Sequence, residues 1–128
     1  MNGCRRRLLR CGTVLALACA GLVAGRAPTA KHVLQLRIAR RKIENAPATI
    51  RVTAGDLVEL RWTTDEATTV HLHGYDLTLV LEPGTEGRMR FEANATGRFP
   101  ISAHGFGTAP DKGANREVVL LYLEVHPA

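Results

Sequence analysis

The chain has 128 residues, with 17 Lys and Arg against 12 Asp and Glu, a formal net charge of +5 when histidines are neutral. Five of the basic residues fall within the first 26 positions, so the remaining 12 balance the 12 acids, all of which lie beyond residue 43. A near-neutral remainder gives no reason to expect binding to nucleic acid or to an anionic membrane surface.

The first 30 residues are predicted to be a secretory signal peptide. "MNGCRRRLLR" carries four arginines and no acid, and "GTVLALACAGLVAG" follows it as an uncharged run of small apolar residues. This is the layout of a cleaved leader, and the run is too short for a membrane span. "RRRLLR" fits a twin-arginine export pattern, and an ordinary arginine-rich secretory leader is the alternative. Residues 31–128 are therefore expected to form a periplasmic or secreted mature domain without a membrane span.

All the cysteines lie in this leader, at Cys4, Cys11 and Cys19. The mature domain is thus predicted to have no disulfide, no thiolate metal ligand and no cysteine nucleophile. Its length of roughly 100 residues is enough for one domain with one core.

Beyond residue 31, apolar and polar residues alternate with a period of two, and turn signals such as Ala54-Gly55-Asp56 and Pro83-Gly84 recur at short intervals. Seven or eight short strands without a convincing helix argue for an antiparallel β-sandwich. The strands are predicted, in chain order, at 33–42, 48–53, 57–63, 68–73, 77–82, 87–93, 98–103 and 117–125.

Alternation within these strands predicts which side chains face the core. In "GRMRFEA", Met89 and Phe91 share one face, so Met89 is better explained as a core residue than as a soft metal ligand. The same alternation buries Val119 and Leu121 in the last strand and turns Tyr122 outward.

Two histidines one residue apart, in "VHLHGYDL", are the first candidate site. Successive side chains of a strand point to opposite faces, so His71 and His73 share a face, with Cα atoms roughly 6.5–7 Å apart. Two imidazoles at that spacing can converge on one ion, as they do in copper and zinc proteins. The alternative is that both histidines are polar surface residues of a solvated strand.

The order of motifs over residues 50–105 resembles that of the cupredoxins. It runs V-x-x-G-D before a hydrophobic strand, a histidine at the end of the next strand, PG before a strand of the x-V-x-F-x-A type, and G-x-F/Y before a ligand region. The match covers most of the mature domain and rests on the order and spacing of the motifs together. It implies a Greek-key β-sandwich with a metal site.

The ligand region departs from the electron-transfer cupredoxins, which place a cysteine shortly after the G-x-F/Y strand and then a histidine and usually a methionine. Here "GRFPISAHG" supplies Ser102, Ala103 and His104 but no cysteine, and no methionine follows Met89. A blue copper site needs a thiolate, so this chain cannot form one. It is more similar to exported cupredoxin-like domains with an HxHGYD motif, a resemblance that implies a fold and a metal site but no established activity.

The resemblance implies His104 as a third ligand beside His71 and His73, because the strand that it ends reaches the same end of a cupredoxin sandwich as the first histidine. Three neutral imidazoles with water in an open position suit Cu(II) well, and zinc nearly as well.

Three further residues are expected around the ligands. Ser102 lies two residues before His104 on the same face and is expected to orient a water. Tyr75 or Asp76 is expected to accept a hydrogen bond from an imidazole N–H and fix its tautomer. By default, Tyr75 and Asp76 are ordinary turn residues.

The function that these residues favour is copper binding for storage, delivery or tolerance, with an unidentified protein as donor or acceptor of the metal. The alternative is a metal-free interaction module that uses an exposed apolar patch around Phe106 or Tyr122. No enzymatic activity is predicted, because Asp76 and Glu82, the next acids after the histidines in the sequence, are not spaced as an acid/base pair.

Overall fold

The computed structural model describes residues 30–107 and 116–128. The predicted signal peptide lies outside this range except for its last residue, and no helix in the range is long and apolar enough to cross a membrane. The described part of the chain consists of strands joined by turns. The strands are β1 (Lys31–Ala39), β2 (Lys42–Ile43), β3 (Thr49–Thr53), β4 (Leu57–Thr64), β5 (Thr68–Leu72), β6 (Leu77–Leu81), β7 (Gly87–Glu92), β8 (Gly97–His104) and β9 (Val118–His126).

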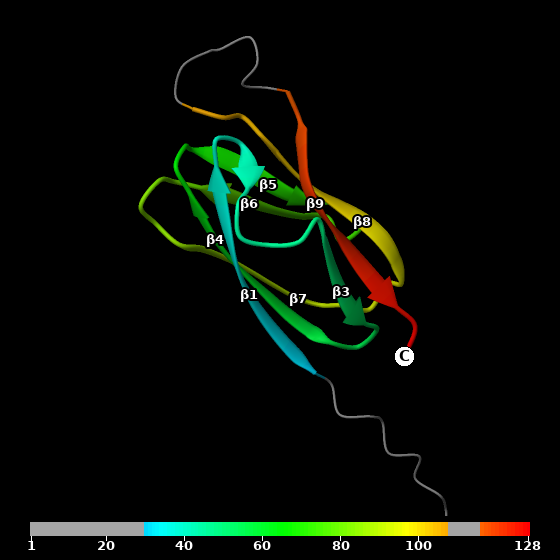
Figure 1. The fold of residues 1–128 in the computed structure, drawn as a ribbon. Helices are drawn as coiled ribbons and strands as arrows, with labels where there is room; N and C mark the ends of the chain where they lie inside the picture. Colours follow the sequence, from blue (N-terminus) through cyan, green and yellow to red (C-terminus); the bar gives the residue numbers. More distant parts are fainter. Residues whose placement is uncertain (1–29, 108–115) are drawn as a thin grey trace, which may run out of the picture.

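The strands form two sheets that pack face to face (Figure 1). One sheet has the order β2-β1-β4-β7 and the other the order β3-β9-β8-β5-β6. The predicted fold class, an all-β Greek-key sandwich, is confirmed, but the expectation of purely antiparallel pairing is wrong. β1 pairs with β4 and β3 pairs with β9 in parallel, because the chain crosses between the sheets before it returns to the partner strand.

The first predicted strand, 33–42, is divided in two. Arg40 and Arg41 have φ angles of 49° and 63°, in the left-handed region, and form a tight turn. The Arg40 N–H donates to Oδ2 of Asp65 at 2.9 Å, and Ile38 pairs with Ile43 across the hairpin. This turn makes β2 a separate strand.

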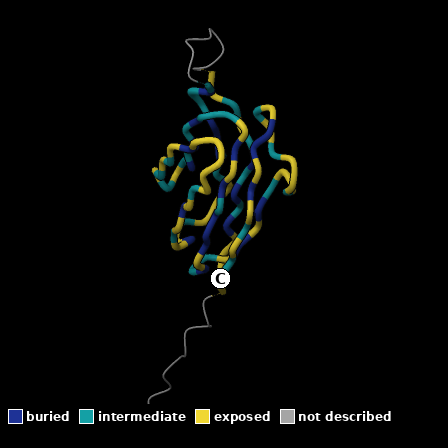
Figure 2. The backbone as a smooth tube through the Cα atoms, turned by 90° about the vertical axis from the view of Figure 1, so that its left-hand side faces the viewer, coloured by how far each residue is buried: buried dark blue, intermediate teal, exposed yellow. Residues whose placement is uncertain are grey.

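The core lies between the sheets and is built from alternate residues of the strands (Figure 2). Val70 and Leu72 of β5 are fully buried, as Trp62 is from the opposite sheet. Because Val70 and Leu72 face inward, His71 between them faces outward. Met89 is buried as predicted, whereas Phe106, expected in an exposed patch, is 1% exposed and belongs to the core.

The last strand departs from the predicted alternation. Ile101 pairs with Leu121, but the next residue, Ser102, pairs with Val119, so Leu120 is the extra residue of a β-bulge. A shift of one residue turns the preceding side chains to the other face. Val119, predicted to be buried, is therefore 50% exposed on the outer face of the five-stranded sheet.

A side-chain contact between His32 and Asp56 fastens β1 to the turn before β4. Oδ2 of Asp56 accepts the N–H of Thr53 at 2.9 Å and lies 2.7 Å from Nε2 of His32. The Thr53 N–H, followed by the contact with His32, lowers the pKa of Asp56 below its ordinary value.

We expect Asp56→Asn to lower the melting temperature at pH 7, with a smaller deficit in acid. The pKa of this carboxyl is lower in the folded chain, so its charge stabilises the fold above the ordinary aspartate pKa of about 3.9. That contribution is lost as the pH falls through the folded pKa. Thermal unfolding followed by circular dichroism at several pH values measures the difference, and an equal deficit at neutral and acid pH would contradict this role.

Candidate metal site

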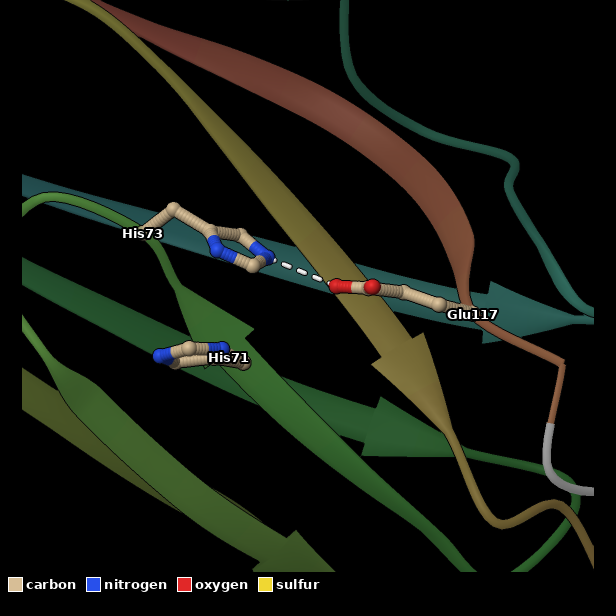
Figure 3. Close-up of side chains that lie close together, drawn as sticks. All are labelled: His71, His73 and Glu117. Carbon is tan, nitrogen blue, oxygen red and sulfur yellow. Dashed lines mark hydrogen bonds and ion pairs between the residues drawn. The ribbon is translucent and has the colours of Figure 1, made fainter.

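The two histidines of the motif stand on the outer face of the five-stranded sheet. His71 lies near the end of β5, opposite Ser102 of β8. His73 comes just after β5, and its N–H donates to the carbonyl of Pro100 at 3.1 Å, which carries the strand's direction one residue further. The two imidazole centroids are 4.1 Å apart with their planes tilted by 46° (Figure 3).

The turn after His73 requires glycine. Gly74 has φ +82°, and a Cβ at this position would overlap the ring of Phe99. Asp76, at φ 57°, completes the turn into β6. The Gly in HGYD therefore lets the hairpin lie directly on Phe99.

Tyr75 anchors this turn to the end of the sandwich. Its ring packs against Phe91 and Phe99, with centroids 5.1 Å away in each case. Its hydroxyl donates to the carbonyl of Ala95 at 2.7 Å and accepts the N–H of the same residue at 3.1 Å. The hydroxyl is engaged there, and not with either imidazole as the sequence suggested.

Glu117, which the sequence analysis missed, lies beside the histidine pair. Its Oε1 is 2.7 Å from Nε2 of His73 and also accepts the hydroxyl proton of Ser102. Ser102 Oγ is 2.8 Å from the same Nε2. One ligating atom from each of His71, His73 and Glu117 can be chosen so that all three atoms lie within 4.8 Å of one another.

The surroundings favour a negative charge on Glu117. The hydrogen bond from Ser102 lowers the pKa of this carboxyl most, and His73 and the charge of His104 act in the same direction against the cost of burial. The site is open to solvent, since the side chains of His71, His73 and Glu117 are 26%, 35% and 49% exposed.

The other predicted site residues, His104, Asp76 and Ser102, lie around the pair but outside the group of three. His104 is opposite Thr69, two residues beyond Ser102, and lies outside the group of three. Asp76 is fully exposed, with Oδ1 3.7 Å from Nε2 of His71. Ser102 is completely buried beneath His73.

Ser102, His73 and Glu117 have the composition of a hydrolytic triad but not its geometry. In a triad the serine and the acid contact opposite nitrogens of the imidazole. Here both reach Nε2, and the serine hydroxyl is fully buried. Two imidazoles with a nearby carboxylate instead form a donor set that suits Cu(II) or Zn(II).

No protein-family model matches this chain, and no curated protein sequence does. Solved structures similar to it include a chain of a heme-copper terminal oxidase dimer, at 19% identity and a TM-score of 0.57, which covers 76% of this chain and 65% of that one. A multi-copper oxidase from Pseudomonas thermotolerans matches at 20% identity and a TM-score of 0.55. The match covers 78% of this chain and 30% of the oxidase chain. A copper-binding protein in its apo form matches at 8% identity and a TM-score of 0.54. The match covers 79% of this chain and 93% of that protein.

These likenesses define the fold, which is a cupredoxin-like β-sandwich. The chain spans about two thirds of the first of these structures and less than a third of the second.

We expect Tyr75→Phe to destabilise the fold by about 1 kcal/mol, because the change removes the hydroxyl that bonds to Ala95. Metal affinity should stay unchanged, since this hydroxyl contacts neither imidazole. Urea unfolding and a metal-competition titration of the same variant measure the two effects. Weaker metal binding at full stability would show that Tyr75 acts on the histidines after all.

Proposed function

We propose that this chain binds one copper ion on the outer face of the five-stranded sheet, at the site of His71, His73 and Glu117, and serves copper storage, delivery or tolerance after export. The observation that supports this most is the pair of imidazoles 4.1 Å apart beside a carboxylate that its neighbours keep ionised. Such a group attracts a divalent cation and offers it two imidazole nitrogens beside a negative charge.

The donor set argues for Cu(II) over zinc. Intrinsic affinity at nitrogen and oxygen sites is higher for Cu(II), and the similar folds include proteins described as a multi-copper oxidase and a copper-binding protein. Without a thiolate the site is expected to be non-blue, which disfavours electron transfer. The exposure of all three side chains favours a metal that is exchanged with a protein donor or acceptor.

A retention experiment tests this proposal. The purified protein is loaded with equimolar Cu(II) and Zn(II), desalted against a weak chelator and assayed for both metals. We expect one copper per chain in the wild type and none in the His71→Ala/His73→Ala double variant. His126→Ala is a matched control, because Nε2 of His126 also lies 2.9 Å from a glutamate, Glu124, on the same sheet.

Copper retained by the double variant would contradict the proposed site, and zinc retained in place of copper would contradict the choice of metal. The control should keep its copper.

A metal-free interaction module remains the second candidate, supported by two exposed valines on the face that carries the histidines. Val80 is 67% exposed opposite Thr69, and Val119 is 50% exposed opposite Ser102. An apolar surface of this kind suits contact with another protein. This function predicts that Val80→Lys abolishes binding to the partner while His71→Ala leaves it intact.

A further inference from the structure

The hydrogen bonds around His73 define which of its ring nitrogens carries a proton. Nε2 lies 2.7 Å from Oε1 of Glu117 and 2.8 Å from Oγ of Ser102. An ionised carboxylate can only accept, so the nitrogen at this distance must be the donor. The single hydroxyl proton of Ser102 goes to Glu117, which leaves the serine oxygen to accept from His73. Both contacts therefore require the proton on Nε2.

These contacts also block a metal from approaching Nε2. A metal binds an imidazole nitrogen at about 2.0–2.1 Å, and along the Nε2 direction that position lies between the nitrogen and the two oxygens. Ser102 is fully buried within β8 and cannot move aside without disturbing the sheet.

The other nitrogen of His73 is free to bind. Nδ1 has no hydrogen-bond partner among residues 30–107 and 116–128. In Figure 3 it lies on the side of the ring away from the contact with Glu117, and the ring of His71 lies below that of His73. A neutral imidazole with a proton on Nε2 has its lone pair on Nδ1.

We infer that the metal is bound by Nδ1 of His73 together with His71, and that Glu117 and Ser102 are positioning residues which hold Nε2–H. This inference rests on the proposed copper site and assigns the role of each residue in it. Metal-binding histidines commonly donate their second N–H to a carboxylate, which fixes the tautomer and raises the basicity of the binding nitrogen. The side chains of His71 and His73 are partly exposed, which leaves room for water or for a donor from another protein.

The tautomer and the binding nitrogen are both measurable by long-range ¹H–¹⁵N NMR of the imidazoles in the purified chain. The spectra are recorded without metal and then with Zn(II) alone, which is diamagnetic. We expect His73 to carry its proton on Nε2 before zinc is added. Zinc should then shift Nδ1 of His73 and one nitrogen of His71, while Nε2–H of His73 persists.

Two other outcomes would overturn the inference in distinguishable ways. A zinc-dependent shift at Nε2 of His73, with loss of its proton, would make Nε2 the binding atom and would remove the positioning role of Glu117, while the copper site itself stands. No zinc-dependent shift at either histidine would overturn the inference, and the copper retention experiment decides separately whether the site binds copper.

A pair of variants at one position gives a second readout. Glu117→Gln keeps an oxygen that accepts from Nε2–H but loses the negative charge, so zinc affinity should fall less than in Glu117→Ala. Glu117→Ala removes the acceptor and should weaken affinity by roughly 10- to 100-fold, as loss of an outer hydrogen-bond partner does at other metal sites. Equal losses in the two variants would indicate that Glu117 binds the metal directly.

Discussion

Replacing either His71 or His73 by alanine is expected to weaken Cu(II) binding by more than roughly 100-fold. Loss of an outer hydrogen-bond partner weakens metal binding by roughly 10- to 100-fold, and loss of a ligand should weaken it more. Each change removes one of two imidazoles that stand 4.1 Å apart, and a single exposed imidazole holds copper poorly. Competition titration against a chromogenic chelator measures the loss. Both side chains face outward from β5 and the turn after it, so the fold should keep its stability.

His104→Ala is the informative comparison for these two variants. His104 lies outside the group of three and is expected to affect copper binding much less, through its charge near Glu117. A loss as large as that in His71→Ala would instead restore the ligand set that the cupredoxin resemblance implies, with His104 as the third ligand.

Gly74→Ala is expected to have the largest effect on stability among changes near the site, about 2–5 kcal/mol. The residue has φ +82°, which costs an alanine about 1–2 kcal/mol. Its Cβ would also overlap Phe99, and overpacking of this kind costs about 1–3 kcal/mol more. Urea unfolding measures the loss of stability, and copper affinity should fall as well because the turn positions His73.

Gly84→Ala separates the two contributions. Gly84 has nearly the same backbone conformation, at φ +79°, but a Cβ there would meet nothing within 4 Å. This variant should therefore lose only the backbone part, about 1–2 kcal/mol. Equal losses at the two positions would mean that contact between the turn and Phe99 is unimportant.

The strand pattern of this chain could be predicted because most strands bury one face and expose the other. In β5, fully buried Val70 and Leu72 flank His71, so simple alternation was sufficient to place the first histidine on the outer face. His73 could be placed only in part, since it lies in the turn and keeps its direction through a hydrogen bond to Pro100. The parallel pairings and the division of the first strand depend on contacts between distant segments that periodicity does not contain.

A single feature, the bulge at Leu120, accounts for one wrong prediction, the burial of Val119, and for the missed Glu117. Unbroken alternation puts Val119 and Glu117 on the core side with Leu121. The extra residue reverses every side chain before it, so Val119 becomes exposed and Glu117 lies on the face of the histidines. The apolar run "VVLLY" conceals this shift, because it alternates in neither register.

The carboxylate of Glu117 also could not be found from a sequence motif, because it lies 44 positions from His73. The strand order brings it close, since β9 pairs with β8 and β8 pairs with β5. Ser102, at the centre of that arrangement, could be predicted because it shares a face with His104 along one strand. Its role as the shared partner of His73 and Glu117 required the register of three strands.

The measurement that tests the central claim most directly is the electron paramagnetic resonance spectrum of the Cu(II)-loaded protein, compared with the spectra of His71→Ala and His73→Ala. We predict a non-blue Cu(II) signal with hyperfine coupling to two imidazole nitrogens, one of which is lost in each variant. A signal that is the same in the wild type and both variants, or no bound copper in the wild type, would contradict a copper site built on these two histidines.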